Sequence, residues 1–157
     1  MRGRRVGMPA YIWNTNHRMW KVVPPFANSF DVLKAYVCDP CAYVYWSTPQ
    51  HQAEIKAGDT AYIFRTVDAQ GIVAQGVVEE APRRLAPTNL AAFAFPVRLT
   101  PPGWDEEVAP SAWKTGIRVE RTFWDAPICN GFRPAHGVIG RLTDTDVAGI
   151  SSEIAAR

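Results

Sequence analysis

The stretch TAYIFRTVDAQGIVAQGVVE, residues 60–79, decides the fold class of this chain. Its two halves, residues 60–66 and 71–79, are rich in β-branched and aromatic residues, which predicts two strands. The residues between them, 68–71 (DAQG), are typical of a hairpin turn. Gly76 lies inside the second predicted strand and indicates a bulge or a close approach of another backbone. We therefore expect an antiparallel β-hairpin here.

More strands are predicted on either side of this hairpin. Upstream, residues 10–14 (AYIWN) and 42–47 (AYVYWS) are short apolar runs of strand-forming residues. Downstream, every second residue of the stretch 93–99 is apolar, which is the period of a strand, and Pro96 places that strand at a sheet edge or a bulge. Residues 117–124 predict the last strand.

Two amphipathic helices are predicted outside the strands. The first begins at Asn28 and Ser29, which are typical N-cap residues, and ends before Pro40. The second begins at the capping-box sequence of residues 143–146. Apolar residues recur at helical spacing in both helices: Phe30, Leu33 and Val37, then Val147, Ile150 and Ile154. Because strands and helices do not alternate strictly, we expect an α+β fold, a small and mostly antiparallel β-barrel with flanking helices.

The composition limits what the chain can be. It has 157 residues, 47% of them apolar and 20% charged, which is typical of one folded domain and excludes disorder. We expect that domain over residues 10–157, after a flexible basic tail at residues 1–9. The sequence has no apolar run long enough for a membrane helix and no signal peptide, so we expect a cytoplasmic protein with no membrane partner. The net charge of +2 argues against a protein that wraps a nucleic-acid duplex.

The segment YWSTPQH, residues 45–51, is a candidate binding site because an aromatic strand runs there into a polar loop. The flat ring of Trp46, with the hydroxyls of Ser47 and Thr48 beside it, suits a planar ligand such as a nucleobase. Stacking on an aromatic side chain contributes about 1–3 kcal/mol per base. The alternative is that Trp46 is a core residue, which is the usual role of a buried aromatic side chain.

A second aromatic segment, residues 11–17 (YIWNTNH), also ends in polar side chains. Asn14 and Asn16 each offer a donor and an acceptor together, which fits the edge of a base. The alternative is that both are turn or cap residues, positions that asparagine also favours.

Taken together, these pieces resemble the EVE domain, a member of the PUA-like superfamily that is related to YTH and ASCH domains. The resemblance rests on YIWNTN, YWSTPQH, the KAGD turn at residues 56–59 and GIVAQGVVEEAP at residues 71–82, in that order. Two later stretches also fit the family: FPVRLT, and GVIGRLTDTDVAGI, its last strand and closing helix. The resemblance implies a small barrel whose pocket accepts a flipped-out modified base, such as 5-methylcytosine or another methylated base. It implies DNA or RNA carrying that base as the partner.

The resemblance also assigns site residues. Trp46 matches one wall of the base pocket, and Asn14 and Asn16 match polar residues that read the base edge in relatives. Trp13 is a candidate for either the pocket or the core, because strand parity places it opposite Asn14 and the two cannot face one pocket. The expected pocket residues are Trp46, Ser47, Thr48, Asn14, Asn16 and Trp13. Independently of the resemblance, the basic side chains of His51, Arg83, Arg84 and Arg98 are candidates for contacts to the nucleic-acid backbone. The alternative for His51 is a surface or capping role.

Neither a metal, nor a cofactor, nor a catalytic constellation is predicted. Cys38 and Cys41 form a single CxxC pair without the second pair that a zinc site needs, and neither His51 nor His136 lies in a known catalytic context. Two other functions stay open. One is a small hydrolase that acts on modified nucleosides, as in ASCH relatives. The other is a protein-interaction module of a restriction-type defence system, with a nuclease or an ATPase as partner.

Overall fold

The computed structural model describes residues 9–19, 26–38, 43–84, 113–128 and 139–157. The predicted strand at residues 93–99, together with Arg98, lies outside this part of the chain. Cys41, His136 and residues 1–8 of the predicted tail also lie outside it. Among the described helices, none combines the length and the apolar character that a membrane span requires.

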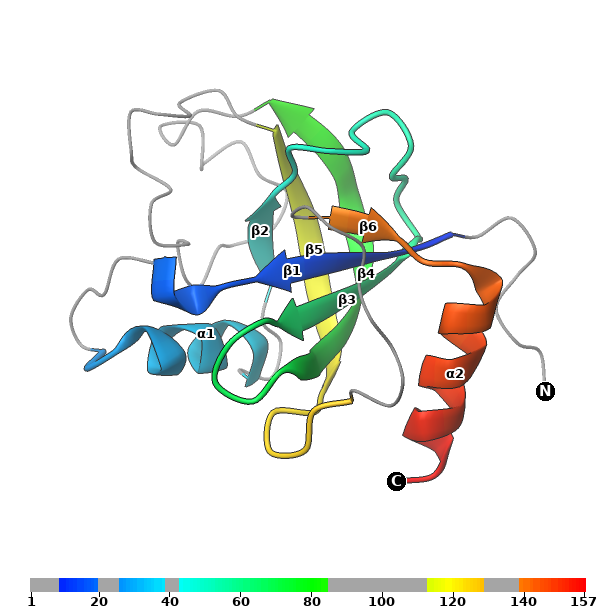
Figure 1. The fold of residues 1–157 in the computed structure, drawn as a ribbon. Helices are drawn as coiled ribbons and strands as arrows, with labels where there is room; N and C mark the ends of the chain where they lie inside the picture. The colour runs from blue at the N-terminus through cyan, green and yellow to red at the C-terminus, as the bar shows by residue number, and fades with distance from the viewer. Residues whose placement is uncertain (1–8, 20–25, 39–42, 85–112, 129–138) are drawn as a thin grey trace.

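Six strands form one curled sheet, a half-barrel, in the order β2-β5-β4-β3-β1-β6 (Figure 1). Their bounds are Ala10–Thr15 (β1), Tyr43–Ser47 (β2), Thr60–Arg65 (β3), Gly71–Arg84 (β4), Trp113–Thr122 (β5) and Ile139–Arg141 (β6). Strands β1 and β3 pair in parallel, and every other pair in this sheet is antiparallel. The predicted α+β class with a small, mostly antiparallel barrel is therefore confirmed as a mixed sheet that curls halfway.

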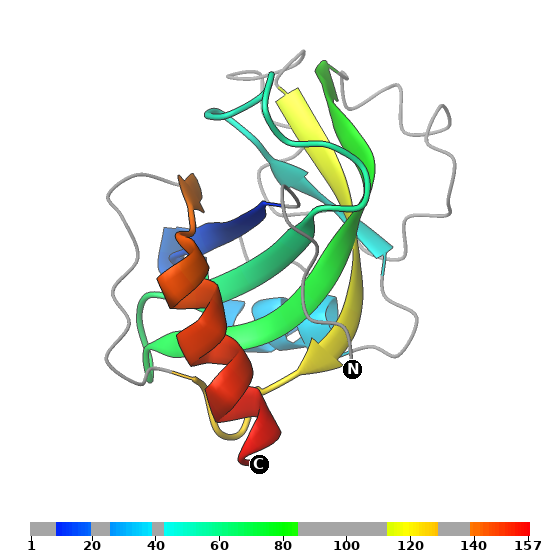
Figure 2. The ribbon, with the colours of Figure 1, turned by 90° about the vertical axis from the view of Figure 1, so that its right-hand side faces the viewer.

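The two helices cover opposite faces of the sheet. Helix α1 (Ser29–Cys38) buries Leu33 and Val37 among residues of the inner face, in the same cluster as Trp13 and Ile117. Helix α2 (Asp144–Ala155) buries its apolar residues against the outer face, in the cluster of Ile12 and Phe64. Figure 2 shows α2 on the side of the sheet away from α1. The chain thus has an inner core inside the half-barrel and an outer core under α2.

The predicted hairpin is confirmed as β3 and β4. The connection between the paired residues Arg65 and Gly71 is longer than a two-residue turn, and it places Asp68 and Ala69 in the left-handed region, with φ of 57° and 71°. The capping box is confirmed too, because Thr143 Oγ1 accepts a hydrogen bond from Asp146 N while Asp146 Oδ2 accepts one from Thr143 N, both at 3.1 Å. The predicted strands at residues 10–14 and 42–47 are β1 and β2, each shifted by one residue at one end.

The predicted last strand at residues 117–124 needs correction. Strand β5 begins at Trp113 and ends at Thr122, and β6 follows it in the chain. Strand β6 has three residues, too few for a period of two to be visible. It forms because its backbone pairs with β1, which is a tertiary contact rather than a local preference.

Gly76 marks an irregular point in the sheet, as its position in the sequence predicts. The register between β4 and β5 shifts between Gln75 and Gly76, and a Cβ atom on Gly76 would overlap the carbonyl oxygen of Arg118. We expect Gly76→Ala to lower the free energy of unfolding by about 1–3 kcal/mol, because the neighbouring backbone must move. Gly149 in α2 is the matched control, since a Cβ there meets nothing within 4 Å. Gly149→Ala should raise stability by about 0.5–1 kcal/mol in the same urea titration, and equal effects of the two substitutions would contradict the close approach.

A buried polar cluster ties the end of β1 to α1 and to the β3–β4 turn. It is centred on His17, the first residue of the short helix η1 (His17–Met19), whose side chain is 2% exposed. Its Nδ1 lies 2.9 Å from Ser29 Oγ, and its Nε2 lies 2.9 Å from Asp68 Oδ2. Arg18 also pairs with Asp68.

This cluster should make stability depend on pH. Burial, followed by the nearby Arg65 and Arg18 charges, holds the pKa of His17 below its ordinary value, although Asp68 opposes the shift. The unfolded chain therefore binds a proton at a pH where the folded chain does not. The contribution of neutral His17 to the free energy of unfolding is complete above about pH 6.5 and is lost as the pH falls. Chemical denaturation at about pH 7.5 and at about pH 5 measures the effect. Between these pH values the free energy of unfolding should fall more for wild type than for His17→Gln. Identical pH profiles for wild type and His17→Gln would refute the prediction.

Candidate nucleic-acid-binding site

The loop that follows β2 joins the two edges of the curled sheet. Strand β2 lies at one edge and β6 at the other, with four strands between them. Gln50 Oε1 nevertheless accepts a hydrogen bond of 3.0 Å from the backbone N–H of Ile139 in β6. The ring of His51 lies 5.7 Å from that of Tyr11 in β1. The YWSTPQH segment thus brings Trp46 to the same side of the molecule as β1.

Trp46 and Thr48 point into the half-barrel, while Ser47 between them is exposed. Trp46 is 5% exposed and belongs to the inner core. Thr48 is buried, and its hydroxyl contacts both the carbonyl oxygen of Trp46, at 3.0 Å, and the hydroxyl of Thr115. The backbone N–H of Thr48 donates to the carbonyl of Trp113 at 2.9 Å. These bonds hold the end of β2 against β5 and fix the position of the Trp46 ring.

Trp13 lies in the same inner core as Trp46, so the structure brings these two predicted pocket residues together. Tyr11 lies beside Trp13 on the same face of β1 and in the same cluster. Both side chains carry a buried polar atom, Tyr11 Oη and Trp13 Nε1, for which the described residues supply no hydrogen-bond partner. Burial, above all, raises the pKa of Tyr11, so its hydroxyl keeps its proton and can donate. The inner core therefore contains two buried donors next to a tryptophan ring.

The two asparagines are placed differently from the tryptophans. Asn14 is half-buried and lies on the opposite face of β1 from Trp13, as strand parity predicts. Asn16 is exposed, and its Oδ1 accepts a hydrogen bond of 3.1 Å from the backbone N–H of Arg18. Asn16 therefore acts as a turn residue in this structure, which agrees with the alternative to a base contact. The structure does not bring either asparagine into the cluster of Trp13 and Trp46.

A group of basic side chains lies at the Ser47 end of β2. Lys114 pairs with Ser47 on one side and with Arg83 on the other in the sheet register. Its side chain is buried and its Nζ donates to Ser47 Oγ at 2.9 Å, while burial lowers the pKa of this lysine. The exposed Arg83 and Arg84 end β4 beside it, with Arg83 contacting Glu80 at 3.1 Å. The contact between Lys114 and Ser47 depends on strand register, which is why the sequence alone did not predict it.

His51 lies at the margin of the inner core. It is half-buried against Tyr11, its backbone is left-handed with φ of 60°, and its Nδ1 lies 3.2 Å from Glu54 Oε2. A phosphate contact from His51 stays a prediction. Within the described residues, no group of three or more potential ligands is arranged to hold a metal ion.

Known structures share this fold. The human THYN1 protein, solved in complex with DNA containing 5-methylcytosine, aligns with a TM-score of 0.55 and 11% identity over 92% of this chain and 96% of that chain. A hypothetical protein from Leishmania major aligns with a TM-score of 0.54 and 13% identity, over 98% and 100% of the two chains. A crystal structure from Pseudomonas putida aligns with a TM-score of 0.51 and 11% identity, over 91% and 97%.

No protein-family model and no curated protein sequence matches the chain. Identities this low extend the likeness to the fold and not to individual side chains. The chain therefore shares its fold with these three structures.

Proposed function

We propose that this protein binds nucleic acid and reads a modified base, such as 5-methylcytosine, that is flipped into the inner core beside Trp46. The observation that carries the proposal is the pair of buried donors, Tyr11 Oη and Trp13 Nε1, in the same cluster as the Trp46 ring. A buried polar group without a partner costs about 1–3 kcal/mol. The carbonyl oxygens and ring nitrogens of a base are acceptors that would recover this energy.

The same arrangement supports discrimination of a methylated base. Stacking on the Trp46 ring is available to any base, so it contributes affinity without sequence preference. A methyl group can be read only by apolar contact, which is worth about 0.8 kcal/mol per buried carbon. The inner core around Trp46 supplies apolar neighbours such as Ile139 and Ile117. The likeness in fold to human THYN1, solved with DNA containing 5-methylcytosine, also supports this class of ligand.

The basic residues at the Ser47 end of β2 would contact the phosphates next to the flipped base. Because the described part of the chain places Lys114, Arg83 and Arg84 there, we expect log affinity to fall with log salt concentration at a slope of about −2 to −4. Fluorescence anisotropy with a labelled oligonucleotide at several salt concentrations measures the slope. The Arg83→Ala, Arg84→Ala double variant should flatten it by about one to two units, whereas Arg157→Ala, beyond the end of α2, should not. A slope near zero for wild type would remove the phosphate contacts from the proposal.

Incubation with free modified nucleosides separates a reader from the hydrolase alternative. A reader should quench its tryptophan fluorescence on addition of the preferred nucleoside and return that nucleoside unchanged in chromatography. Formation of product would instead support a hydrolase of the ASCH type. The base pocket would be contradicted if every modified nucleoside and oligonucleotide gave no fluorescence change and no product.

A further inference from the structure

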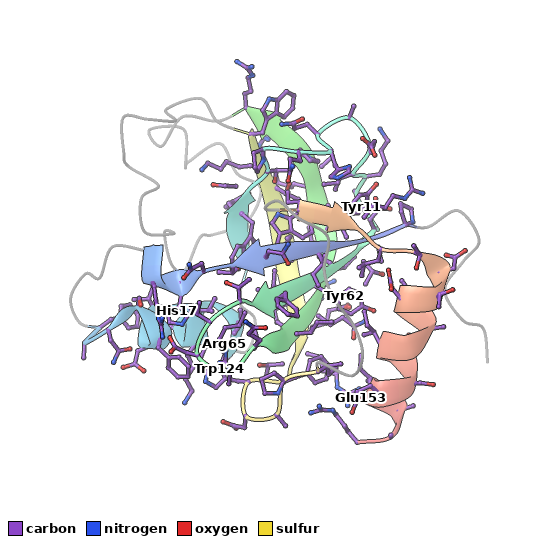
Figure 3. All side chains as sticks on the ribbon, in the orientation of Figure 1. Tyr11, His17, Tyr62, Arg65, Trp124 and Glu153 are labelled. Atoms are coloured by element: carbon purple, nitrogen blue, oxygen red, sulfur yellow. The ribbon has the colours of Figure 1, made fainter. Side chains whose placement is uncertain are left out.

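Outside the proposed base site, the structure places a serine, a histidine and an aspartate side by side, with the serine hydrogen-bonded to the histidine and the aspartate in ion-pair contact with it. Ser29 Oγ lies 2.9 Å from His17 Nδ1, and Asp68 Oδ2 lies 2.9 Å from His17 Nε2. Figure 3 shows His17 beside α1, at the opposite end of β1 from Tyr11. The three residues come from three elements: Ser29 begins α1, His17 begins η1, and Asp68 lies in the β3–β4 turn.

The protons in this group of three residues are arranged for transfer away from the serine. A carboxylate can only accept a hydrogen bond, so the ring nitrogen that faces Asp68 carries the proton. The other nitrogen then has a lone pair, and the Ser29 hydroxyl donates to it. The hydrogen bond from Arg18, in the first place, lowers the pKa of Asp68, which keeps this carboxylate ionised. Burial keeps the imidazole neutral at pH 7, and a neutral imidazole is able to take a proton.

The start of α1 adds donors beside the serine. The backbone N–H groups of Asp31 and Val32 bond to Asn28, to its Oδ1 at 2.8 Å and its carbonyl oxygen at 3.3 Å. The N–H groups of Ser29 and Phe30 precede them in the first helical turn, where no i−4 carbonyl of the helix is available. They lie at the positive end of the helix, and the amide that follows a nucleophilic serine is a common donor to an oxyanion. Ser29 itself is partly exposed, so a substrate can reach it.

We propose that Ser29, His17 and Asp68 form a second, catalytic site that hydrolyses small carboxylic esters. Ser29 Oγ bonds to the carbonyl carbon while its proton moves to His17, and the carbonyl electron pair becomes an oxyanion at the first turn of α1. The bond from that carbon to the alcohol oxygen then breaks, and the alcohol leaves with the proton from His17. Water attacks the acyl-Ser29, gives one proton to His17, and releases the carboxylic acid as the serine is restored.

The site differs from the serine hydrolase arrangement in one respect. Here the serine is hydrogen-bonded to Nδ1 and the aspartate lies against Nε2, whereas the usual order is the reverse. Both nitrogens are chemically able to act as the base, because the proton on one leaves the lone pair on the other. The roles of the three groups, rather than the names of the atoms, define the constellation.

Labelling with a small fluorophosphonate probe, followed by peptide mass spectrometry, tests the proposal on the full chain. We expect the probe on Ser29, and slow hydrolysis of p-nitrophenyl acetate that Ser29→Ala abolishes. His17→Gln should slow labelling by about 100-fold and Asp68→Asn by about 10-fold or more. Ser152→Ala, in an exposed position on α2, should label like wild type.

Thermal melts of each variant show whether it folds, and the labelling of wild type decides the question even if a variant unfolds. A serine that only ties α1 to His17 would not react faster than an ordinary surface serine. Wild-type protein that carries no label on Ser29, or equal labelling of Ser29 in wild type and a folded His17→Gln variant, would overturn the proposal. The base site contains none of these three residues, so its own tests are independent of this result.

Discussion

Replacing Trp46 with alanine should weaken binding to the preferred oligonucleotide by about 1–3 kcal/mol, a factor of roughly 5–150. The physical reason is the loss of the ring on which the flipped base stacks. Trp46→Phe should recover part of the affinity, since a smaller ring still stacks. Isothermal titration of wild type and both variants with one oligonucleotide measures the effect.

Stability must be measured on the same variants because Trp46 is 5% exposed and belongs to the inner core. Truncation of a buried tryptophan can cost about 3–5 kcal/mol of unfolding free energy. Trp124→Phe is the matched control for Trp46→Phe, because Trp124 is buried in the same inner core but contacts Phe30 and Arg65. It should lower stability without changing affinity. Unchanged affinity in a folded Trp46→Ala protein would remove Trp46 from the base site.

Replacing Arg65 with alanine should lower the free energy of unfolding by about 3 kcal/mol. Its guanidinium lies 4.4 Å from the Trp124 ring centroid and 5.1 Å from that of Phe30, and its Nε donates to the carbonyl of Ala69 at 2.8 Å (Figure 3). A desolvated cation–π contact contributes about 2 kcal/mol, and a hydrogen bond from a charged donor about 1.5–3 kcal/mol. Release of the buried charge offsets part of this sum.

Two further substitutions separate charge from shape at Arg65. Arg65→Met keeps much of the buried stem without the charge, so it should cost less than Arg65→Ala. Arg65→Lys keeps the charge but loses the flat group that stacks, so it should cost more than Arg65→Met. The exposed Arg121, whose guanidinium lies 5.3 Å from the Phe123 ring centroid, is the control, and Arg121→Ala should cost at most about 1 kcal/mol. Urea titrations in which Arg65→Ala and Arg121→Ala cost the same would refute the stacking role of Arg65.

Local chemistry made the hairpin and the second helix predictable. Strand-forming residues flank the turn at Asp68, and the capping box at Thr143 marks where α2 begins. The parallel pairing of β1 with β3 and the short strand β6 were not predictable in this way. Both depend on which strands meet when the sheet curls, and that is a property of the whole chain.

In the candidate site, too, local sequence predicts some features, while others depend on tertiary contacts. The alternation of side chains along β1 correctly separated Trp13 from Asn14, and the sequence marked Trp46 as the residue to examine. That Tyr11 and Trp13 leave polar atoms buried near Trp46 depends on the loop that spans from β2 to β6, which the sequence does not reveal. The contact of His17 with Ser29 and Asp68 likewise joins residues that are distant in the chain and carry no spacing signal.

Competition between two oligonucleotides that differ in a single methyl group on the base tests the modified-base reading most directly. The comparison should cover 5-methylcytosine against cytosine and N6-methyladenine against adenine, in both DNA and RNA. We expect a preference of about fourfold or more for at least one methylated oligonucleotide, because a buried methyl group contributes about 0.8 kcal/mol or more, and we expect Trp46→Ala to abolish it. Equal affinity for every methylated and unmethylated pair would contradict the reading of a methylated base.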